Sequence, residues 1–326
     1  MKEEYIPFVN DLIELAIRED IGDGDHSSLA CIPHDERGRM KLLVKQEGVL
    51  AGVEVAETVL RRLDPEAKFE KRLDDGARVQ PGDIAFYVEG RLISLLQAER
   101  ILLNIMQRMS GVATQTAVYV QELDGLKTQV IDTRKTTPGM RVLDKMAVRI
   151  GGGGNHRIGL FDMVILKDNH IDFAGGITPA IRKTQAYLKE KGKNIPIEVE
   201  VRSLDDIREV LSVGGVDRIM LDNFSPETTR EAVALIGGRY ETESSGGITL
   251  KNRILATPIQ SAGTTAGGAP TEKACAFFGE RAKGGAAVVT MGEAAVNSGY
   301  AIRLGQTTDL TRFDFQKADD FRRFVY

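Results

Sequence analysis

From about residue 128, five strand-like stretches of this chain each end in polar or small residues, and these ends are the first candidates for chemistry. The stretches are TQVID, DMVILK, IPIEVEV, DRIMLD and GRYETESS, and they end at Arg134–Lys135, Lys167, Glu200, Asp222 and Ser244–Gly247. In a barrel of alternating strands and helices, reactive residues lie at the C-terminal ends of the strands. The repeated pattern therefore predicts a functional site at one edge of a sheet.

The charge along residues 134–170 predicts an anionic ligand. This segment holds seven basic side chains against three aspartates, in a chain whose formal net charge is −4. The basic residues are Arg134, Lys135, Arg141, Lys145, Arg149, Arg157 and Lys167. Cations that converge on one site favour phosphates or carboxylates. For Arg141, Lys145 and Arg149, a solvated helix face is an equal alternative.

Two glycine-bearing segments are candidates for presenting backbone N–H groups to an anion. GGGGNHR at 151–157 lacks Walker A spacing, and a flexible turn is the alternative interpretation. His156 and Arg157 directly after the glycines favour a ligand-binding loop, although His156 and His170 could equally be structural hydrogen-bonding residues. SSGGI at 244–248 has the small residues of a phosphate turn, a pattern that identifies no ligand by itself.

Glu200 and Asp222 end two successive strands and are candidates for binding Mg²⁺ or sugar hydroxyls. A glycosidase-like acid and base would also fit, but would leave the basic residues unexplained. Structural ion pairing with Arg134 or Lys167 is the other alternative. Taken together, these groups predict a ligand with several phosphates or carboxylates, a sugar and a divalent cation. Catalysis would then rest on positioning and electrostatic stabilisation.

The elements that position these residues indicate an α/β protein. Residues 6–19 and 54–64 have helical spacing, 39–46 reads as a strand, and 91–121 reads as a helix broken at Gly111. From about residue 128, strands alternate with helices, which predicts βα units and a parallel sheet. We therefore expect an α+β N-terminal domain at 1–110, an α/β barrel at 111–250 and a further βα segment at 251–326.

Composition excludes several classes of protein. The negative net charge gives no general attraction to nucleic acid or anionic membranes. The two cysteines are far apart and lack CxxC spacing, which argues against disulfides or a zinc site. The N-terminus is too charged for a signal peptide, and no apolar run approaches the roughly 18 residues of a membrane span. We expect a cytoplasmic protein that acts on small molecules.

The motifs resemble a known family. They are DTRKTTPGMR (132–141), GGGGNHRIGLFDMVILKDNHI (151–171), IEVEV (197–201), IMLDNF (219–224) and SSGGI (244–248). They resemble quinolinate phosphoribosyltransferase, the carboxylating nicotinate-nucleotide pyrophosphorylase. The earlier strings AIREDIGDGDHSS, EGVLAGVEVAE, DGARVQPGD and LLQAERILLNIMQRMSGVAT are similar to the N-terminal domain of that family. The resemblance covers roughly residues 6–250.

The resemblance implies a reaction and a role for each matched residue. Quinolinate and phosphoribosyl pyrophosphate would give nicotinate mononucleotide, pyrophosphate and CO₂, with Mg²⁺ as cofactor. The quinolinate carboxylates and nearby phosphates would be held by Arg134, Lys135, His156, Arg157 and Lys167. The ribose hydroxyls and the metal–pyrophosphate would be bound by Glu200 and Asp222, and the 5′-phosphate by Ser245, Gly246 and Gly247. The expected catalytic residues are Lys135, Glu200 and Asp222.

The resemblance also implies a homodimer in which Arg100, in the string QAER, reaches the site of the neighbouring subunit. A related pyrophosphorylase of the molybdenum-transport type is an alternative, but the set of cations matches the quinolinate pattern more fully. A fusion protein that binds ligand without turnover is a third hypothesis, because the family's last phosphate loop has no match after residue 250.

From residue 250 the chain resembles another family. LKNRILATPIQSAGTTAGGAPTEKACAFFGERAKGGAAVVTMGEAAVN (250–297) is similar to the first βα units of old yellow enzyme and dienoyl-CoA reductase flavoproteins. We do not expect flavin binding, because the rest of that barrel is missing. The strand pattern at 284–292 predicts that this segment completes the first barrel. The alternative is a poorly docked tail with exposed strand edges.

Overall fold

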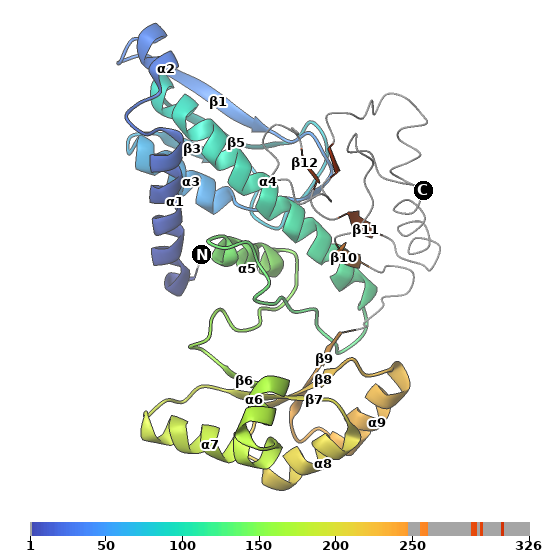
Figure 1. The fold of residues 1–326 in the computed structure, drawn as a ribbon. Helices are drawn as coiled ribbons and strands as arrows, with labels where there is room; N and C mark the ends of the chain where they lie inside the picture. Colours follow the sequence, from blue (N-terminus) through green and yellow to red (C-terminus); the bar gives the residue numbers. More distant parts are fainter. Residues whose placement is uncertain (1, 247–254, 260–287, 292–293, 296–307, 310–326) are drawn as a thin grey trace. The chain divides into compact units, whose positions relative to one another are not determined.

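The structure is a computed structural model that describes residues 2–246, 255–259, 288–291, 294–295 and 308–309 (Figure 1). The helices are a 3-10 turn at Glu3–Tyr5, then α1 (Ile6–Asp20), α2 (His26–Cys31), α3 (Val53–Leu63), α4 (Leu92–Glu122), α5 (Arg141–Ile150), α6 (Asp168–Ala174), α7 (Ile177–Glu190), α8 (Leu204–Val213) and α9 (Pro226–Ile236). The strands before residue 250 are β1 (Arg37–Leu43), β2 (Gly48–Val49), β3 (Lys68–Lys71), β4 (Arg78–Val79), β5 (Ile84–Arg91), β6 (Val164–Leu166), β7 (Ile197–Val201), β8 (Arg218–Asp222) and β9 (Glu241–Ser245).

The described chain divides into two compact units. One comprises Met1–Leu166, Pro179–Glu198 and Gly215–Asp217, and the other comprises Lys167–Thr178, Val199–Gly214 and the chain from Arg218. The N-terminal part has the α+β character expected from the sequence. Its antiparallel sheet has the order β1-β5-β3, and its buried core is formed largely by apolar residues of α1, α3, α4 and α5.

Helix α4 runs without interruption through Gly111, so the expected break there is wrong. Its buried residues include Ile105, Met109 and Ala113, spaced by four, and they hold the helix against the core on both sides of the glycine. Gly111 is exposed and has no atom within 4 Å of the position where a Cβ would lie. Tertiary packing therefore overrides the lower helix propensity of glycine at this position.

Replacing Gly111 with alanine should raise the free energy of unfolding by about 0.5–1 kcal/mol, because alanine loses less conformational entropy in a helix and has open space here. Denaturation in urea measures this change. The matched variant is Gly151→Ala, whose Cβ would lie 2.8 Å from Cβ of Thr116 and should lower stability instead. A Gly111→Ala protein no more stable than the wild type would contradict a continuous helix.

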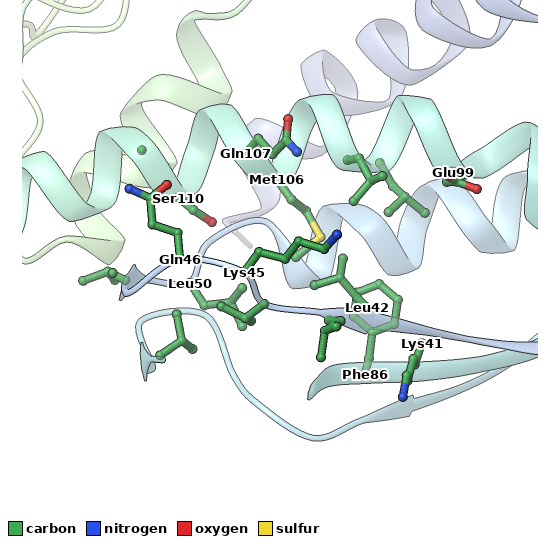
Figure 2. A pocket seen from close by; sticks show the side chains of 18 of the residues that line it. Lys41, Leu42, Lys45, Gln46, Leu50, Phe86, Glu99, Met106, Gln107 and Ser110 are labelled. Carbon is green, nitrogen blue, oxygen red and sulfur yellow. The ribbon is translucent and has the colours of Figure 1, made fainter. Parts of the chain in front are cut away.

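A cavity of about 880 Å³ lies in the N-terminal part, lined by residues of β1, β2, β5 and α4. Figure 2 shows Leu42, Phe86 and Met106 along its apolar side, with Lys45 and Glu99 among its polar residues. None of the residues that the sequence assigned to chemistry lines this cavity.

A second sheet has the strand order β6-β7-β8-β9 (Figure 1). The N–H of Val164, at the start of β6, donates to the carbonyl of Pro196, just before β7, at 2.9 Å. The N–H of Asp217, just before β8, donates to the carbonyl of Ile197 at 2.8 Å, and β8 and β9 pair in parallel. Neighbouring strands therefore begin side by side, which confirms the predicted parallel arrangement. Their C-terminal ends lie at one edge.

The strand predicted at 128–132 forms only an isolated parallel bridge, between Ile131 and Gly154. The N–H of Gly154 donates to the carbonyl of Val130 at 2.7 Å, and that of Asp132 donates back to Gly154 at 3.2 Å. The partner is the end of a glycine turn rather than a strand, so the ladder stops there. Closure of the sheet into a barrel stays a prediction, as do the domain boundaries.

After residue 250 the structure describes four short strands: β10 (Leu255–Ile259), β11 (Val288–Met291), β12 (Ala294–Ala295) and β13 (Thr308–Asp309). β10 pairs in parallel with β11, and β12 pairs in parallel with β13. Within the described residues, these pairs are sheets of their own and are not hydrogen-bonded to β9. Residues 284–287 and 292 of the expected barrel-closing segment 284–292 lie outside the described residues, as do residues 247–254, where the resemblance changes from one family to the other.

Candidate active site

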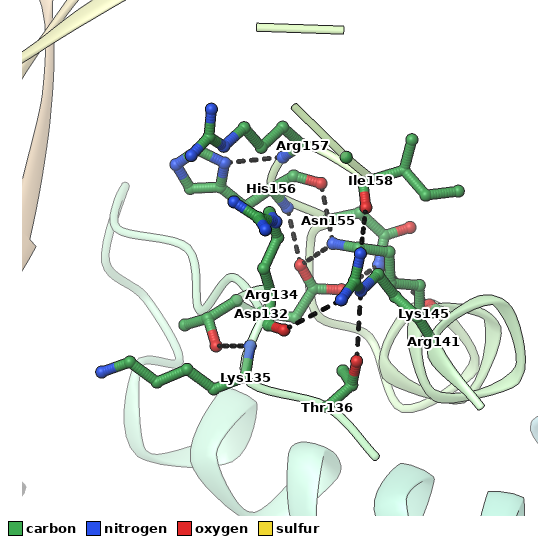
Figure 3. A network of polar contacts seen from close by, with 12 residues as sticks. Asp132, Arg134, Lys135, Thr136, Arg141, Lys145, Asn155, His156, Arg157 and Ile158 are labelled. Atoms are coloured by element: carbon green, nitrogen blue, oxygen red, sulfur yellow. Dashed lines mark hydrogen bonds and ion pairs between the residues drawn. The ribbon is translucent and has the colours of Figure 1, made fainter. Parts of the chain in front are cut away.

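Asp132 is the centre of a buried polar network in the first unit (Figure 3). One of its carboxylate oxygens accepts from Nζ of Lys145 and from the N–H of His156, the latter at 2.8 Å. The other accepts from Nδ2 of Asn155 at 2.7 Å. The network ties the segment after residue 130 to helix α5 and to the turn that follows it. It thereby positions the neighbouring basic residues.

Lys145 is not on a solvated helix face, so that alternative is wrong for this residue. Only 1% of its side chain is exposed, and its Nζ also donates to the carbonyl of His156 at 2.8 Å. Arg141 is partly buried too and donates to Oγ1 of Thr136 and to the carbonyl of Ile158. For Arg149, which is exposed, the solvated face is confirmed.

The four glycines at 151–154 form a packed turn, and the expectation that their N–H groups face an anion is wrong. All four N–H groups donate to backbone carbonyls, at 2.7–3.0 Å. A Cβ on Gly153 would lie 2.9 Å from both Thr116 and Val148, and one on Gly154 would lie 2.9 Å from Gln129. Glycine is required at 151 and 153 because the turn lies directly against α4 and α5, and at 154 because Gln129 lies close, not because a ligand approaches.

His156 has protein partners on both ring nitrogens. Its Nδ1 accepts from the N–H of Arg157 at 2.6 Å, which requires that nitrogen to be unprotonated. Its Nε2 therefore carries the hydrogen and donates to Oε2 of the fully buried Glu198 at 2.9 Å. In this arrangement the ring positions the backbone of Arg157. Direct contact between His156 and a ligand stays a prediction.

Arg134 and Arg157 lie close enough for the charge of Arg134 to act on the Arg157 guanidinium. Burial lowers the pKa of the Arg157 guanidinium, and the positive charge of Arg134 lowers it further. The Nε atoms of both side chains are buried, and neither has a hydrogen-bond partner among the described residues. Two like charges with unsatisfied donors are unfavourable in an apo protein, and an anion would stabilise both.

Two predicted cations of the first unit are exposed. Lys135 follows Arg134, and its backbone N–H donates to Oγ1 of Thr133 at 3.0 Å. Arg100 lies on the surface of α4. Both side chains are therefore accessible to a ligand or to a partner subunit.

In the second unit, Lys167 and Glu200 form an ion pair, with 3.2 Å between Nζ and Oε2. The alternative of structural ion pairing is thus confirmed for these two residues, although Lys167 is half exposed and an exposed pair of this kind contributes little stability. The N–H of Lys167 donates to Nδ1 of His170 at 3.0 Å at the start of α6. His170 therefore has the structural role that the sequence left open.

Asp222, Asn223, Ser245 and Gly246 lie together where β8 and β9 end. Asp222 and Ser245 are register partners in the parallel ladder, and the N–H of Asn223 donates to the carbonyl of Ser245 at 2.8 Å. Nδ2 of Asn223 donates to Oδ2 of Asp222 at 2.8 Å. The structure thus brings together the predicted carboxylate and two residues of the predicted phosphate turn. Gly247 lies outside the described residues.

Sequence reasoning missed Asp132, Asn155, Glu198 and Asn223. Their signals were present: Asp132 and Asn155 stand beside the motif residues, and Glu198 alternates with Glu200 in the otherwise apolar strand IEVEV. A buried acid in such a strand requires a partner, which here is His156. The identity of that partner could not be predicted from the spacing of residues in the sequence.

Fold and site together define an α/β protein whose described residues include an arginine pair suited to an anion and a carboxylate beside a small-residue turn. The family profile described as quinolinate phosphoribosyl transferase, N-terminal domain, matches residues 25–110, and the C-terminal domain profile matches residues 112–266. The chain belongs to the quinolinate phosphoribosyltransferase family.

Individual relatives support the same family assignment. Quinolinate phosphoribosyltransferase [decarboxylating] 1b of Nicotiana tabacum is 42% identical over 255 residues, covering 74% of this chain and 72% of the relative. The probable carboxylating nicotinate-nucleotide pyrophosphorylase of Bacillus subtilis is 39% identical, covering 72% and 79%. The crystal structure of NadC from Streptococcus pyogenes has 41% identity and a TM-score of 0.69, covering 74% of this chain and 84% of that one.

No helix in the described part of the chain is both long and apolar enough to cross a membrane.

Proposed function

We propose that this chain transfers the phosphoribosyl group of phosphoribosyl pyrophosphate to the ring nitrogen of quinolinate in NAD biosynthesis. The products are nicotinate mononucleotide, pyrophosphate and CO₂. The observation that carries the proposal is the pair Arg134 and Arg157, whose buried Nε atoms have no hydrogen-bond partner among the described residues. A guanidinium is shaped to bind a carboxylate through two parallel hydrogen bonds, and quinolinate has two carboxylates.

Quinolinate binding rests on residues of the first unit. Arg134 and Arg157 bind the two carboxylates, and the exposed Lys135 adds a third cation for the ligand or a nearby phosphate. His156 keeps the backbone of Arg157 in place through the bond to its N–H. The guanidinium of Arg157 is also held by the bond from its Nη1 to the carbonyl of Met163 at 2.9 Å, so this group is in place before the ligand arrives.

Phosphoribosyl pyrophosphate binding rests on residues of the second unit. Glu200 and Asp222 bind the ribose hydroxyls, Lys167 neutralises phosphate charge, and Ser245, Gly246 and Gly247 receive the 5′-phosphate. Lys167 contacts Oε2 of Glu200 and Asn223 contacts Oδ2 of Asp222, and the other oxygen of each carboxylate is the one proposed to bind the ligand. Oxygen donors of this type fit Mg²⁺. Bound magnesium would neutralise charge on the leaving pyrophosphate.

The bond changes follow from this arrangement. The bond between C1′ and the pyrophosphate oxygen breaks as the ring nitrogen bonds to C1′. The ring nitrogen then carries a positive charge and accepts the electron pair left when the adjacent carboxylate departs as CO₂. A proton replaces that carboxylate on the ring carbon. The protein contributes positioning and fixed charge to both steps.

A homodimer in which Arg100 acts in trans is part of the proposal, supported by the exposure of Arg100 on α4. If it is correct, mixing Arg100→Ala and Lys135→Ala subunits should restore activity that neither variant has alone. A mixed dimer combines an intact Arg100 with an intact Lys135 at one of its two sites. Random exchange of equal amounts makes about half of the dimers mixed, so about a quarter of wild-type activity is expected. Product formation after subunit exchange measures it, with each variant incubated alone as the control. Mixed dimers that stay inactive would refute action in trans.

A cytoplasmic location and the flavoprotein likeness of residues 250–326 also remain proposals. Relatives in plants are named chloroplastic or mitochondrial. The similarity to the relatives above covers about three quarters of this chain, which leaves room for a tail of other origin.

The test of the proposed function is to supply quinolinate, phosphoribosyl pyrophosphate and Mg²⁺ and to follow nicotinate mononucleotide. Product that requires all three components is expected. Folded protein that binds quinolinate in a calorimeter but forms no product would instead favour the ligand-binding fusion. Nicotinate, with a single carboxylate, is the matched control substrate and should react far more slowly.

A further inference from the structure

Asn223 has an unusual backbone conformation at the edge of the second sheet. Among the described residues, it is the one residue other than glycine with a positive φ, +56°. Asparagine tolerates this left-handed region better than most residues, but such conformations are uncommon and concentrate at functional sites. The conformation places the Asn223 side chain between the end of β8 and the turn after β9.

The Asn223 amide contacts both neighbours. Its Nδ2 donates to Oδ2 of Asp222 at 2.8 Å, the orientation that chemistry requires because the amide oxygen would repel the carboxylate. On its other side lies Gly246, where φ is +70°. A Cβ on Gly246 would lie 2.7 Å from Cγ of Asn223 and still closer to Oδ1. Glycine at 246 therefore leaves room for the Asn223 amide.

We infer that Asn223 is a positioning residue that couples the carboxylate of Asp222 to the turn at Ser245–Gly246. Its amide donates to Oδ2 of Asp222, while its backbone N–H donates to the carbonyl of Ser245 at 2.8 Å. Asn223 thus connects the group that receives the ribose or its metal, through its amide, to the turn that receives the phosphate, through its backbone N–H and its packing against Gly246. The inference rests on the proposed function, in which both groups bind phosphoribosyl pyrophosphate.

The primary test is equilibrium binding of phosphoribosyl pyrophosphate with Mg²⁺, measured by calorimetry on the full chain. Asn223→Gly keeps the left-handed backbone and removes the amide, and Asn223→Asp keeps the shape and removes the donor. Each should weaken binding by at least about tenfold, because a hydrogen bond to a charged group is lost. Quinolinate binding should be unchanged, since Arg134 and Arg157 are untouched.

The matched control is Ser225→Ala. Ser225 accepts from the N–H of Thr228 at 3.1 Å as the N-cap of α9, two residues beyond Asn223. Its loss should lower stability without changing phosphoribosyl pyrophosphate affinity. An Asn223→Gly protein that binds phosphoribosyl pyrophosphate as the wild type does would overturn the inference. Equal losses for quinolinate and phosphoribosyl pyrophosphate would also overturn it, because they would indicate a general structural role.

A double-mutant cycle with Gly246→Ala tests the coupling itself. In the wild-type background, the added methyl group should displace the Asn223 amide and weaken phosphoribosyl pyrophosphate binding. In the Asn223→Gly background, that clash is gone and the same substitution should weaken binding less. Additive effects would contradict the coupling.

Failure of this inference and failure of the proposed function are distinguishable. A wild-type protein that binds phosphoribosyl pyrophosphate but yields no nucleotide refutes the function, while the binding series still decides the role of Asn223. A wild-type protein that does not bind phosphoribosyl pyrophosphate overturns both.

Discussion

Replacing Arg134 with methionine should weaken quinolinate binding by about a hundredfold or more while leaving the ligand-free protein at least as stable as the wild type. The loss of affinity follows from removing a charged, two-pronged carboxylate partner. The ligand-free variant should keep its free energy of unfolding because Arg134 destabilises the apo protein, in which its Nε is buried without a partner among the described residues.

The effect on Arg157 reinforces this expectation. The charge of Arg134 lowers the pKa of the Arg157 guanidinium, so removing that charge should relieve the repulsion between the two groups. A gain in the free energy of unfolding of up to about 1 kcal/mol is expected for the ligand-free variant, the usual trade between stability and function. Quinolinate should raise the melting temperature of the wild type and not that of the variant.

Chemical denaturation measures the free energy of unfolding, and calorimetric titration measures the affinity for quinolinate. Arg149→Met is the matched control, because Arg149 belongs to the same basic segment and is exposed. It should change neither stability nor quinolinate affinity appreciably. An Arg134→Met protein that is destabilised, or that still binds quinolinate tightly, would show that Arg134 is a structural residue.

Replacing Lys145 with methionine should lower the free energy of unfolding by about 3–5 kcal/mol, because it leaves a buried carboxylate without its counter-ion. Asp132 is only 8% exposed at its side chain, and Lys145 only 1%. Methionine has a similar volume, so the effect is one of charge rather than of a cavity.

The double variant Asp132→Asn with Lys145→Met separates charge from packing. Asparagine at 132 retains an oxygen for the N–H of His156 but presents its NH₂ group to the donor Nδ2 of Asn155, so only part of the stability should return. Urea denaturation of the single and double variants measures this recovery. A Lys145→Met protein within about 1 kcal/mol of the wild type would contradict a buried ion pair, since surface substitutions have effects of about that size or less.

Sequence patterns predicted most of the helices and strands but not the tertiary contacts between them. Apolar periodicity placed α1, α3, β6, β7 and β8 correctly because each element buries a single face or is wholly buried. It failed at Gly111, where packing on both sides of the glycine overrides propensity, and at 128–132, where the partner is a turn.

The types of residue that form the candidate site were predicted more successfully than the role of each residue. The cations and carboxylates at strand ends were identified because such residues do not fill a core. The role of the glycines at 151–154 was misassigned because close packing and close approach of a ligand require the same residue. The burial of Lys145 could not be predicted from its helix, because its counter-ion, Asp132, belongs to a segment outside that helix.

The central claim is that this chain couples phosphoribosyl transfer to loss of one quinolinate carboxylate. The most direct measurement uses quinolinate labelled in the carboxylate next to the ring nitrogen and counts CO₂ against nicotinate mononucleotide. Equal amounts of both are expected, formed only when phosphoribosyl pyrophosphate and Mg²⁺ are present. Folded protein that binds quinolinate but releases no labelled CO₂ would contradict it.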